Sequence, residues 1–175
     1  MRAGDPQLLS FVRSALKPFQ ATLFVGSGAA ERVGCGERGL AIACASHAGT
    51  AAHAREAFRL LWGAELETSQ LQCPVPAGGT SALEHNCSGK HAAFLATCRS
   101  LHWPLESYLQ LDHPLQQEVL KRVGDLLGLP GAELLAARDD CGAPTLQLQL
   151  AQMALLYAHL GGGEQADLEQ LSRAM

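Results

Sequence analysis

The sequence predicts a mixed α/β fold built as one domain. Most of the chain consists of segments with helical start and stop signals, separated by stretches that contain glycine and proline. One short apolar run, residues 40–45, follows a glycine-rich stretch and has the composition of a buried strand. A chain of 175 residues normally forms a single domain with its own core. A strand among helices favours a single α/β domain that spans residues 1–175, and it argues against a helical bundle.

The N-terminal segment allows two helices, and propensity alone does not choose between them. In the first, Asp5 caps a helix that begins at Pro6 and ends at Pro18. One face of that helix would carry Leu8, Leu9, Val12 and Leu16. In the second, Ser14 is the cap and the helix runs through Leu23.

Further helices are expected downstream. The segment from Thr50 to Trp62 is helical and ends at Gly63. Helices are also expected at residues 90–100, 114–127, 146–160 and from 166 onward. Between them, residues 72–86 are irregular and residues 139–144 form a turn, because glycine and proline punctuate both stretches.

The composition argues against two classes of partner. The net charge is −4, and the basic residues are scattered singly apart from Lys121 and Arg122, so no nucleic-acid-binding face is indicated. No window of about 18 apolar residues is present, so we expect no membrane span. The N-terminus lacks the apolar stretch of a secretion signal, so we expect a cytoplasmic protein. Whether it forms a homodimer is left open.

The first motif that could carry chemistry is residues 13–18, Arg-Ser-Ala-Leu-Lys-Pro. On a helix, residues three apart share a face, so Ser14 and Lys17 could touch. A serine hydroxyl is a weak nucleophile and needs a base. A lysine amine can be that base if burial lowers its pKa. The alternative is a solvated helix face.

The second motif is residues 43–49, Ala-Cys-Ala-Ser-His-Ala-Gly. A strand followed by a tight turn of small residues would expose the Ser46 hydroxyl and a backbone N–H, which acyl transfer can use for an oxyanion. The alternative is an ordinary turn in which His47 is a hydrogen-bonded turn residue.

The third and fourth motifs, residues 86–91 and 139–144, each place a cysteine in a turn beside a helix start. The helix dipole favours a thiolate there, so Cys87 and Cys141 could share one metal ion. Lys90 is close to Cys87 in the chain but must lose a proton before it can bind metal. The alternative is two small buried thiols. The cysteines assigned to that class are Cys35, Cys73 and Cys98.

Six cysteines in a chain without a secretion signal indicate free thiols or metal ligands in a reducing compartment. No Cys-x-x-Cys pair is present, which argues against a zinc ribbon. A penicillin-recognising acyl transferase is suggested by Ser-x-x-Lys alone. It ranks last, because no Lys-Thr-Gly or Ser-Asp-Asn segment accompanies the motif.

Taken together and in this order, the motifs resemble the bacterial asparaginase II family, the serine-dependent, thermolabile rhizobial type. The matching stretches are residues 4–5, 13–20, 43–49, 86–91, 112–116 and 139–144. Each stretch is short, but the ordered set spans nearly the whole chain.

The resemblance implies a fold like that of serine β-lactamases and glutaminases, with flanking helices and an incomplete sheet. It implies hydrolysis of L-asparagine to L-aspartate and ammonia. Ser14 and Lys17 match the family's catalytic pair, and Ser46 matches its second catalytic serine. The matches to its zinc ligands are Cys87, Lys90 and Cys141. Arg13 and Asp139 match positions near the substrate.

The sequence also departs from the family pattern. Family chains are about twice as long, so by this resemblance the sequence is truncated at both ends and forms a partial domain. Asp140 stands where a glycine is usual. We therefore expect motif residues that still cluster, together with low stability and little activity. The alternative function is an inactive fragment that at most binds zinc or a partner chain.

Overall fold

The computed structural model describes residues 4–175, which form eight α-helices and one three-stranded antiparallel sheet. The helices are α1 (Lys17–Gly26), α2 (Ala29–Arg32), α3 (Glu37–Cys44), α4 (Ala51–Gly63), α5 (Ser88–Leu101), α6 (Pro114–Leu127), α7 (Leu150–Gly162) and α8 (Ala166–Ala174). The strands are β1 (Leu9–Phe11), β2 (Leu135–Arg138) and β3 (Pro144–Gln149). The predicted α/β class is confirmed.

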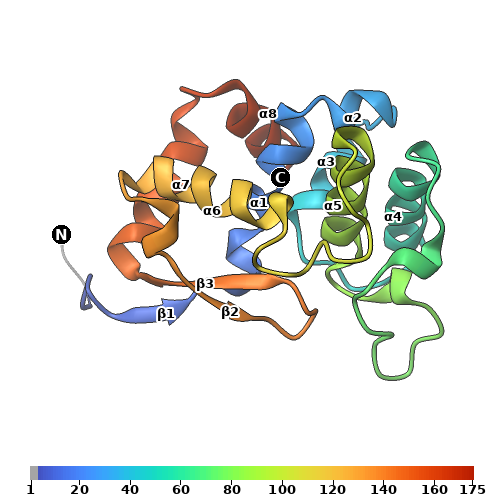
Figure 1. Ribbon diagram of the computed structural model, residues 1–175, viewed down its shortest axis with the longest axis horizontal. Coiled ribbons are helices and arrows are strands. Elements are labelled where there is room, and N and C mark those ends of the chain that lie inside the picture. The colour runs from blue at the N-terminus through green and yellow to red at the C-terminus, as the bar shows by residue number, and fades with distance from the viewer. Residues whose placement is uncertain (1–3) are drawn as a thin grey trace.

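The sheet lies along one side of the molecule, with the helices stacked over it (Figure 1). Its order is β1-β3-β2, so the first strand of the chain pairs with the last. Ser10 lies opposite Leu148, and Ala136 lies opposite Leu146. Leu146 and Leu148 are buried beneath the helices, which fixes the register of the central strand.

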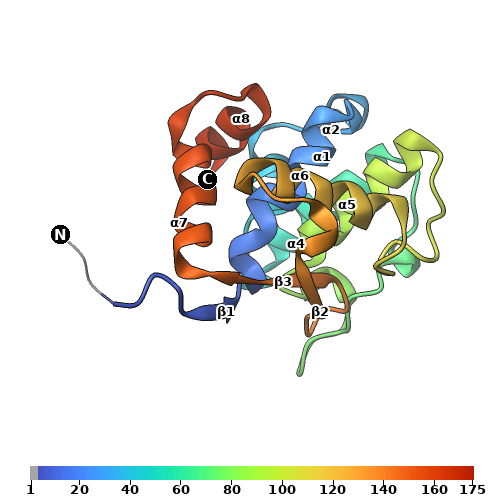
Figure 2. The same cartoon turned by 60° about the vertical axis from the view of Figure 1, so that its left-hand side comes forward.

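Helix α5 is the central element, because every residue from Ser88 to Cys98 is buried. Helices α1, α3, α4 and α6 pack against it. Figure 1 shows α3 beside α5, and Figure 2 shows α1, α4 and α6 near it. The packing is closest at Gly89, where an added Cβ would lie 2.2 Å from the carbonyl oxygen of Ile42 in α3. Glycine at this position therefore allows the first turn of α5 to meet α3.

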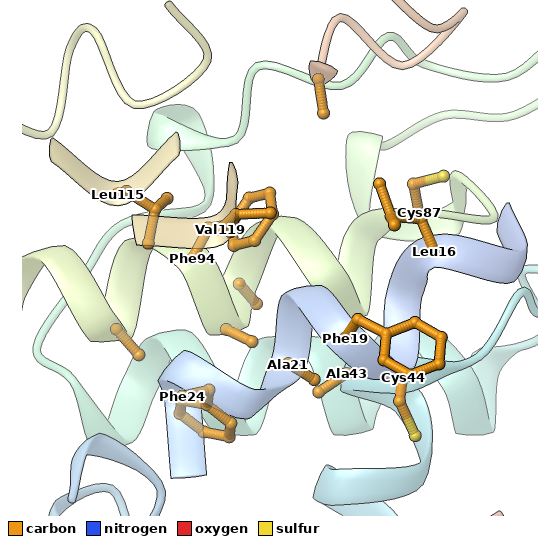
Figure 3. Close-up of a cluster of buried hydrophobic side chains, with 14 of the residues drawn as sticks. Leu16, Phe19, Ala21, Phe24, Ala43, Cys44, Cys87, Phe94, Leu115 and Val119 are labelled. Atoms are coloured by element: carbon orange, nitrogen blue, oxygen red, sulfur yellow. The ribbon is translucent and has the colours of Figure 1, made fainter. Parts of the chain in front are cut away.

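The core draws buried apolar side chains from every α-helix and from β3. Phe19 and Phe24 of α1 are fully buried, and Leu115 and Val119 of α6 point toward Phe94 of α5 (Figure 3). Leu16 and Cys87 belong to the same core cluster, and both are labelled in Figure 3. The start of α1 and the turn before α5 are therefore held by this core.

The prediction of a strand at residues 40–45 is wrong, because residues 37–44 form α3. A short apolar run that is buried on several sides has the same pattern in a strand and in a helix. Two start signals favour the helix. Gly36 is extended at the cap position, and Glu37 lies in the first turn, where an acidic side chain stabilises the helix dipole.

The N-terminal segment follows neither predicted helix fully. Residues 9–11 form β1, so a helix from Asp5 is wrong. Pro18 does not end a helix but lies in the first turn of α1, where its missing N–H has no cost. Ser14 lies in a 3₁₀-helix, Arg13–Leu16, and makes no cap hydrogen bond. Of the second predicted helix, the one capped by Ser14, only the run of helix through Leu23 is confirmed.

The helix predicted at 146–160 is partly wrong, because β3 occupies residues 144–149 and α7 begins at Leu150. Helices were otherwise predicted well. Thr50 caps α4 in a capping box with His53, and the His113 side chain accepts a hydrogen bond from the Leu115 amide at the start of α6. Helix α5 begins at Ser88, two residues earlier than predicted. Among residues 4–175 no helix is both long and apolar enough to cross a bilayer.

Candidate active site

Lys17 is the most constrained polar side chain of the candidate site. It lies at the start of α1 and is only 1% exposed. Its Nζ donates hydrogen bonds to the carbonyl oxygen of Ala45 at 3.0 Å, to the carbonyl oxygen of Asn86 at 2.9 Å and to Ser46 Oγ at 2.8 Å. The amine therefore joins the turn after α3 to the turn before α5.

Ser46 bridges Lys17 to Ser14. Ser46 Oγ lies 2.9 Å from Ser14 Oγ, and both serines are exposed to solvent. Residues 13–16 form a 3₁₀-helix rather than an α-helix, so the expected contact on one helix face is not made. Among the described residues, Lys17 donates no hydrogen bond to Ser14. The structure thus brings all three predicted residues together, in the order Lys17, Ser46, Ser14.

Burial lowers the pKa of Lys17, because the charged amine loses its hydration. Interaction with Cys87 opposes this shift, and the positive charge of Lys90 adds to it. The neutral amine, which is the form that can accept a proton, is thereby favoured.

The turn that carries Ser46 is fixed by His47. The Gly49 amide donates to His47 Nδ1 at 3.2 Å, and His47 Nε2 lies 3.1 Å from Ser88 Oγ, which donates to the Leu83 carbonyl at 2.8 Å. Burial lowers the pKa of His47 to about 4, which keeps the ring neutral, and the Gly49 amide at Nδ1 places the ring proton on Nε2. His47 is therefore a hydrogen-bonded turn residue, as one sequence reading expects.

Arg13 precedes Ser14 in an uncommon backbone conformation, with φ of 51°. The left-handed region costs a non-glycine residue about 1–2 kcal/mol. Two contacts hold it there. The Arg13 amide donates to Thr145 Oγ1 at 2.8 Å, and its guanidinium lies 2.9 Å from Asp139 Oδ1. The guanidinium also contacts Asp140.

The residues predicted to bind metal also come together. Lys90 Nζ lies 3.2 Å from Cys141 Sγ, and all three side chains of Cys87, Lys90 and Cys141 are buried. A hydrogen bond between the two thiols raises the pKa of Cys87 and lowers that of Cys141. In the part of the chain that the structure describes, no three His, Cys, Asp or Glu side chains are placed to share a metal. A metal at this position would need Lys90 as its third ligand.

The other thiols behave as structural residues. Burial raises the pKa of Cys35, Cys73 and Cys98 to about 12, so each stays protonated. Cys44, likewise buried, donates to the Leu40 carbonyl within α3.

Comparison with known proteins decides the family. The model of the L-asparaginase II family matches residues 1–175. The chain belongs to the L-asparaginase II family. A search of proteins with curated descriptions found no match.

In this L-asparaginase II chain, a surface pocket of about 510 Å³ reaches Ser46 from the side of α4. Its lining includes His47, His53, Arg38 and Arg55. Two residues to which sequence analysis gave no role also border the site. They are His91, which follows Lys90 on α5, and Tyr108, whose hydroxyl lies 2.7 Å from His91 Nδ1. The position of His91 directly after Lys90 is the sequence feature that could have placed His91 near the site. Nothing in the sequence places Tyr108 there.

Proposed function

We propose that the chain hydrolyses L-asparagine to L-aspartate and ammonia through a serine acyl-enzyme. The observation that carries this proposal is the continuous chain of hydrogen bonds from Lys17 through Ser46 to Ser14. A buried amine joined to two exposed hydroxyls provides a base, a proton relay and a nucleophile in one line.

The two carbonyl partners of Lys17 set the direction of the relay. A neutral amine has two N–H groups and one lone pair. The carbonyl oxygens of Ala45 and Asn86 have no proton to donate, so they take the two N–H groups. The lone pair then faces Ser46 Oγ, the third partner of the amine. Ser46 can donate to Lys17 and accept from Ser14 at the same time.

Ser14, at the outer end of the relay, is the proposed nucleophile. Its Oγ attacks the side-chain amide carbon of L-asparagine while its proton moves to Ser46 and the proton of Ser46 moves to Lys17. As the C–N bond breaks, a proton returns along the same path to the leaving nitrogen, which departs as ammonia. Water then attacks the ester, which releases L-aspartate and restores the Ser14 hydroxyl.

The neighbouring groups support this assignment. The Ser14 amide lies in the first turn of a 3₁₀-helix, where an N–H has no intrahelical partner and can stabilise the oxyanion. Arg13 carries a cation for the substrate α-carboxylate, and Asp139 carries an anion for its α-ammonium group. In the structure these two side chains neutralise each other, and Arg13 is 55% exposed, so the substrate can replace that contact.

Zinc is the proposed metal, and the residues present fit it. Two cysteine sulfurs are ligands that zinc prefers, and Cys87, Cys141 and Lys90 are close enough to converge. When bound, zinc would supply positive charge that orients the site, rather than a hydroxide nucleophile, because the nucleophile is already provided by serine. We further propose a fold relationship to serine β-lactamases and a cytoplasmic location.

A second candidate is an inactive chain that binds zinc or a partner. Exposed apolar side chains favour it. On the surface lie Leu8 before β1, Leu9 and Phe11 of β1, and Leu150, Leu155 and Tyr157 of α7. The two candidates differ in whether the protein forms an acyl-enzyme.

Mass spectrometry after acid quenching of a reaction with L-asparagine tests the proposal. The expected result is an aspartyl group on the peptide that contains Ser14, and its loss in Ser14→Ala. Hydroxylamine should intercept the same intermediate as aspartyl hydroxamate. Labelling of the Ser46 peptide instead would reassign the nucleophile, and a folded protein that gives no adduct and no hydroxamate would favour the inactive chain.

A further inference from the structure

The short 3₁₀-helix that carries Ser14 is strained at its first residue. It spans Arg13–Leu16, and Arg13 has φ of 51°, in the left-handed region. Ser14 Oγ nevertheless lies 2.9 Å from Ser46 Oγ, in line with the proposed relay. A single 3₁₀ turn has hydrogen bonds of poor geometry, and strained backbone persists only where its surroundings hold it. Contacts from other segments therefore fix the direction of the Ser14 hydroxyl.

Strand β3 holds the backbone just before Ser14. The Val12 amide donates to the Leu146 carbonyl at 2.9 Å, and the Arg13 amide donates to Thr145 Oγ1 at 2.8 Å. Thr145 is buried, so its hydroxyl keeps this position. The side chain of Thr145 thus supplies an acceptor one residue beyond the last backbone contact, at the strained residue itself. Without it, the Arg13 amide would be left without this partner.

Helix α7 holds the backbone just after Ser14. The Tyr157 hydroxyl donates to the Ala15 carbonyl at 3.0 Å. In a 3₁₀-helix, that carbonyl would accept from the residue three positions later, which is Pro18 and has no N–H. Tyr157 therefore supplies a donor that the local sequence lacks.

Tyr157 is itself held in place by α1. Its ring packs edge to face on Phe19, with the ring centroids 5.6 Å apart and an angle of 82° between the planes. Partial burial raises the pKa of Tyr157, so the phenol stays protonated and remains a donor. Because the ring rests on α1 and the hydroxyl binds the turn before α1, Tyr157 fixes the angle at which the turn enters the helix.

We propose that Thr145 and Tyr157 are positioning residues that aim the Ser14 hydroxyl at Ser46. This inference rests on the proposed function, in which Ser14 is the nucleophile. Both side chains bind backbone atoms of the residues that flank Ser14, so they act through the turn and not on the substrate. The effect on rate can be large, because a displacement of about 1 Å can lower a rate by about 100-fold.

Steady-state ammonia release by the full chain and by Tyr157→Phe is the first test. Phenylalanine keeps the ring against Phe19 and removes only the donor. We expect kcat to fall about 10–100-fold, the range for a misplaced reacting group. KM should stay near that of wild type, because Arg13 and Asp139, the proposed substrate-binding residues, keep their contacts. The midpoint of the pH dependence should also stay unchanged, because Lys17 keeps its three partners.

The second test uses a pair of substitutions at Thr145. Thr145→Val keeps the shape and removes the acceptor, so kcat should fall and KM should also rise, because Arg13 is released. Thr145→Ser keeps the acceptor and loses the methyl group, so it should recover most of kcat. A role in packing alone predicts the reverse order, with serine worse than valine.

Thr22→Val is the matched control, because it removes a different buried hydroxyl from α1, one that donates to the Phe19 carbonyl at 2.7 Å. It should leave kcat unchanged. Circular dichroism and thermal unfolding verify that each variant folds. Tyr157→Phe keeps the test decisive even if Thr145→Val does not fold.

Four outcomes would overturn the inference. A folded Tyr157→Phe variant with wild-type kcat, or a Thr145→Ser variant no better than Thr145→Val, would remove the positioning role while the acyl-enzyme on Ser14 stands. An equal loss in Thr22→Val would make the effect one of general packing. A shifted pH midpoint in Tyr157→Phe would place its effect on Lys17. Wild-type protein that forms no acyl-enzyme would refute the proposed function, and this inference with it.

Discussion

Lys17 Nζ lies 2.8 Å from Ser46 Oγ, and the contact with Ser14 is made by Ser46 rather than by the lysine. The two residues of the Ser-x-x-Lys motif therefore communicate through a third residue, 29 positions beyond the lysine. A proton that leaves Ser14 has to pass through the Ser46 hydroxyl, so the three groups should act as one unit.

The first prediction is that Lys17→Met and Ser46→Ala each reduce kcat/KM for L-asparagine by about 10²–10⁴-fold, the usual contribution of a positioned acid or base. Each breaks the same relay, so the double variant should lose no more than the worse single variant. Steady-state ammonia release checks this. Losses that multiply in the double variant would show that the two residues act independently.

The second prediction concerns the pH dependence of activity. The base must be neutral, and burial lowers the pKa of Lys17 below its usual 10.5. Activity should therefore rise with pH as Lys17 loses its proton, with a midpoint below 10.5. Lys17→Arg keeps a positive charge at every accessible pH and should abolish activity together with this rising limb. A rising limb that persists in Lys17→Arg would assign the titration to another group.

The third prediction concerns acid stability. The pKa of His47 is lowered from 6.5 to about 4 in the folded protein, so between these values the unfolded chain binds a proton that the folded chain does not. Stability should be fully present above pH 6.5 and fall as the pH drops toward 4. In His47→Asn, the amide oxygen can still accept from the Gly49 amide, but nothing titrates. Thermal unfolding of this variant should depend less on pH over that interval, and an unchanged dependence would refute the role of His47.

The fourth prediction concerns the contact between α5 and α3. Gly89→Ala places a methyl group 2.2 Å from the Ile42 carbonyl, so one helix must move. Overpacking of this kind costs about 1–3 kcal/mol. Gly26→Ala is the control, because a methyl group there has no neighbour within 4 Å and alanine is the better helix former. Urea unfolding should show a loss of stability for the first variant and none for the second. Equal stability of both would contradict the observed packing.

Much of the local structure could be predicted, because caps and breakers lie beside the elements that they define. Thr50 and Gly63 bound α4 as expected, and His113 with Pro114 opens α6. The strand β3 was also open to prediction. Leu146 and Leu148 alternate with Gln147 and Gln149, a period of two that is typical of a half-buried strand.

The geometry of the candidate site could not be predicted in the same way. The Ser46 bridge depends on where the end of α3 meets the start of α1, and the Tyr108 contact joins a loop to α5 across 17 residues. Such contacts are set by packing between distant segments, which spacing along the chain does not encode. The motifs therefore pointed to residues that the fold brings together, whereas the order in which they touch required the fold.

The most direct test of the central claim is ammonia release from L-asparagine by the folded 175-residue chain and by its Lys17→Met variant. A methionine of similar length should preserve the fold, which circular dichroism can verify. The account predicts that the wild-type chain releases ammonia, even if slowly, and that the rate falls to background in Lys17→Met. A folded wild-type chain that releases no ammonia, or a folded Lys17→Met variant with near-normal turnover, would contradict it.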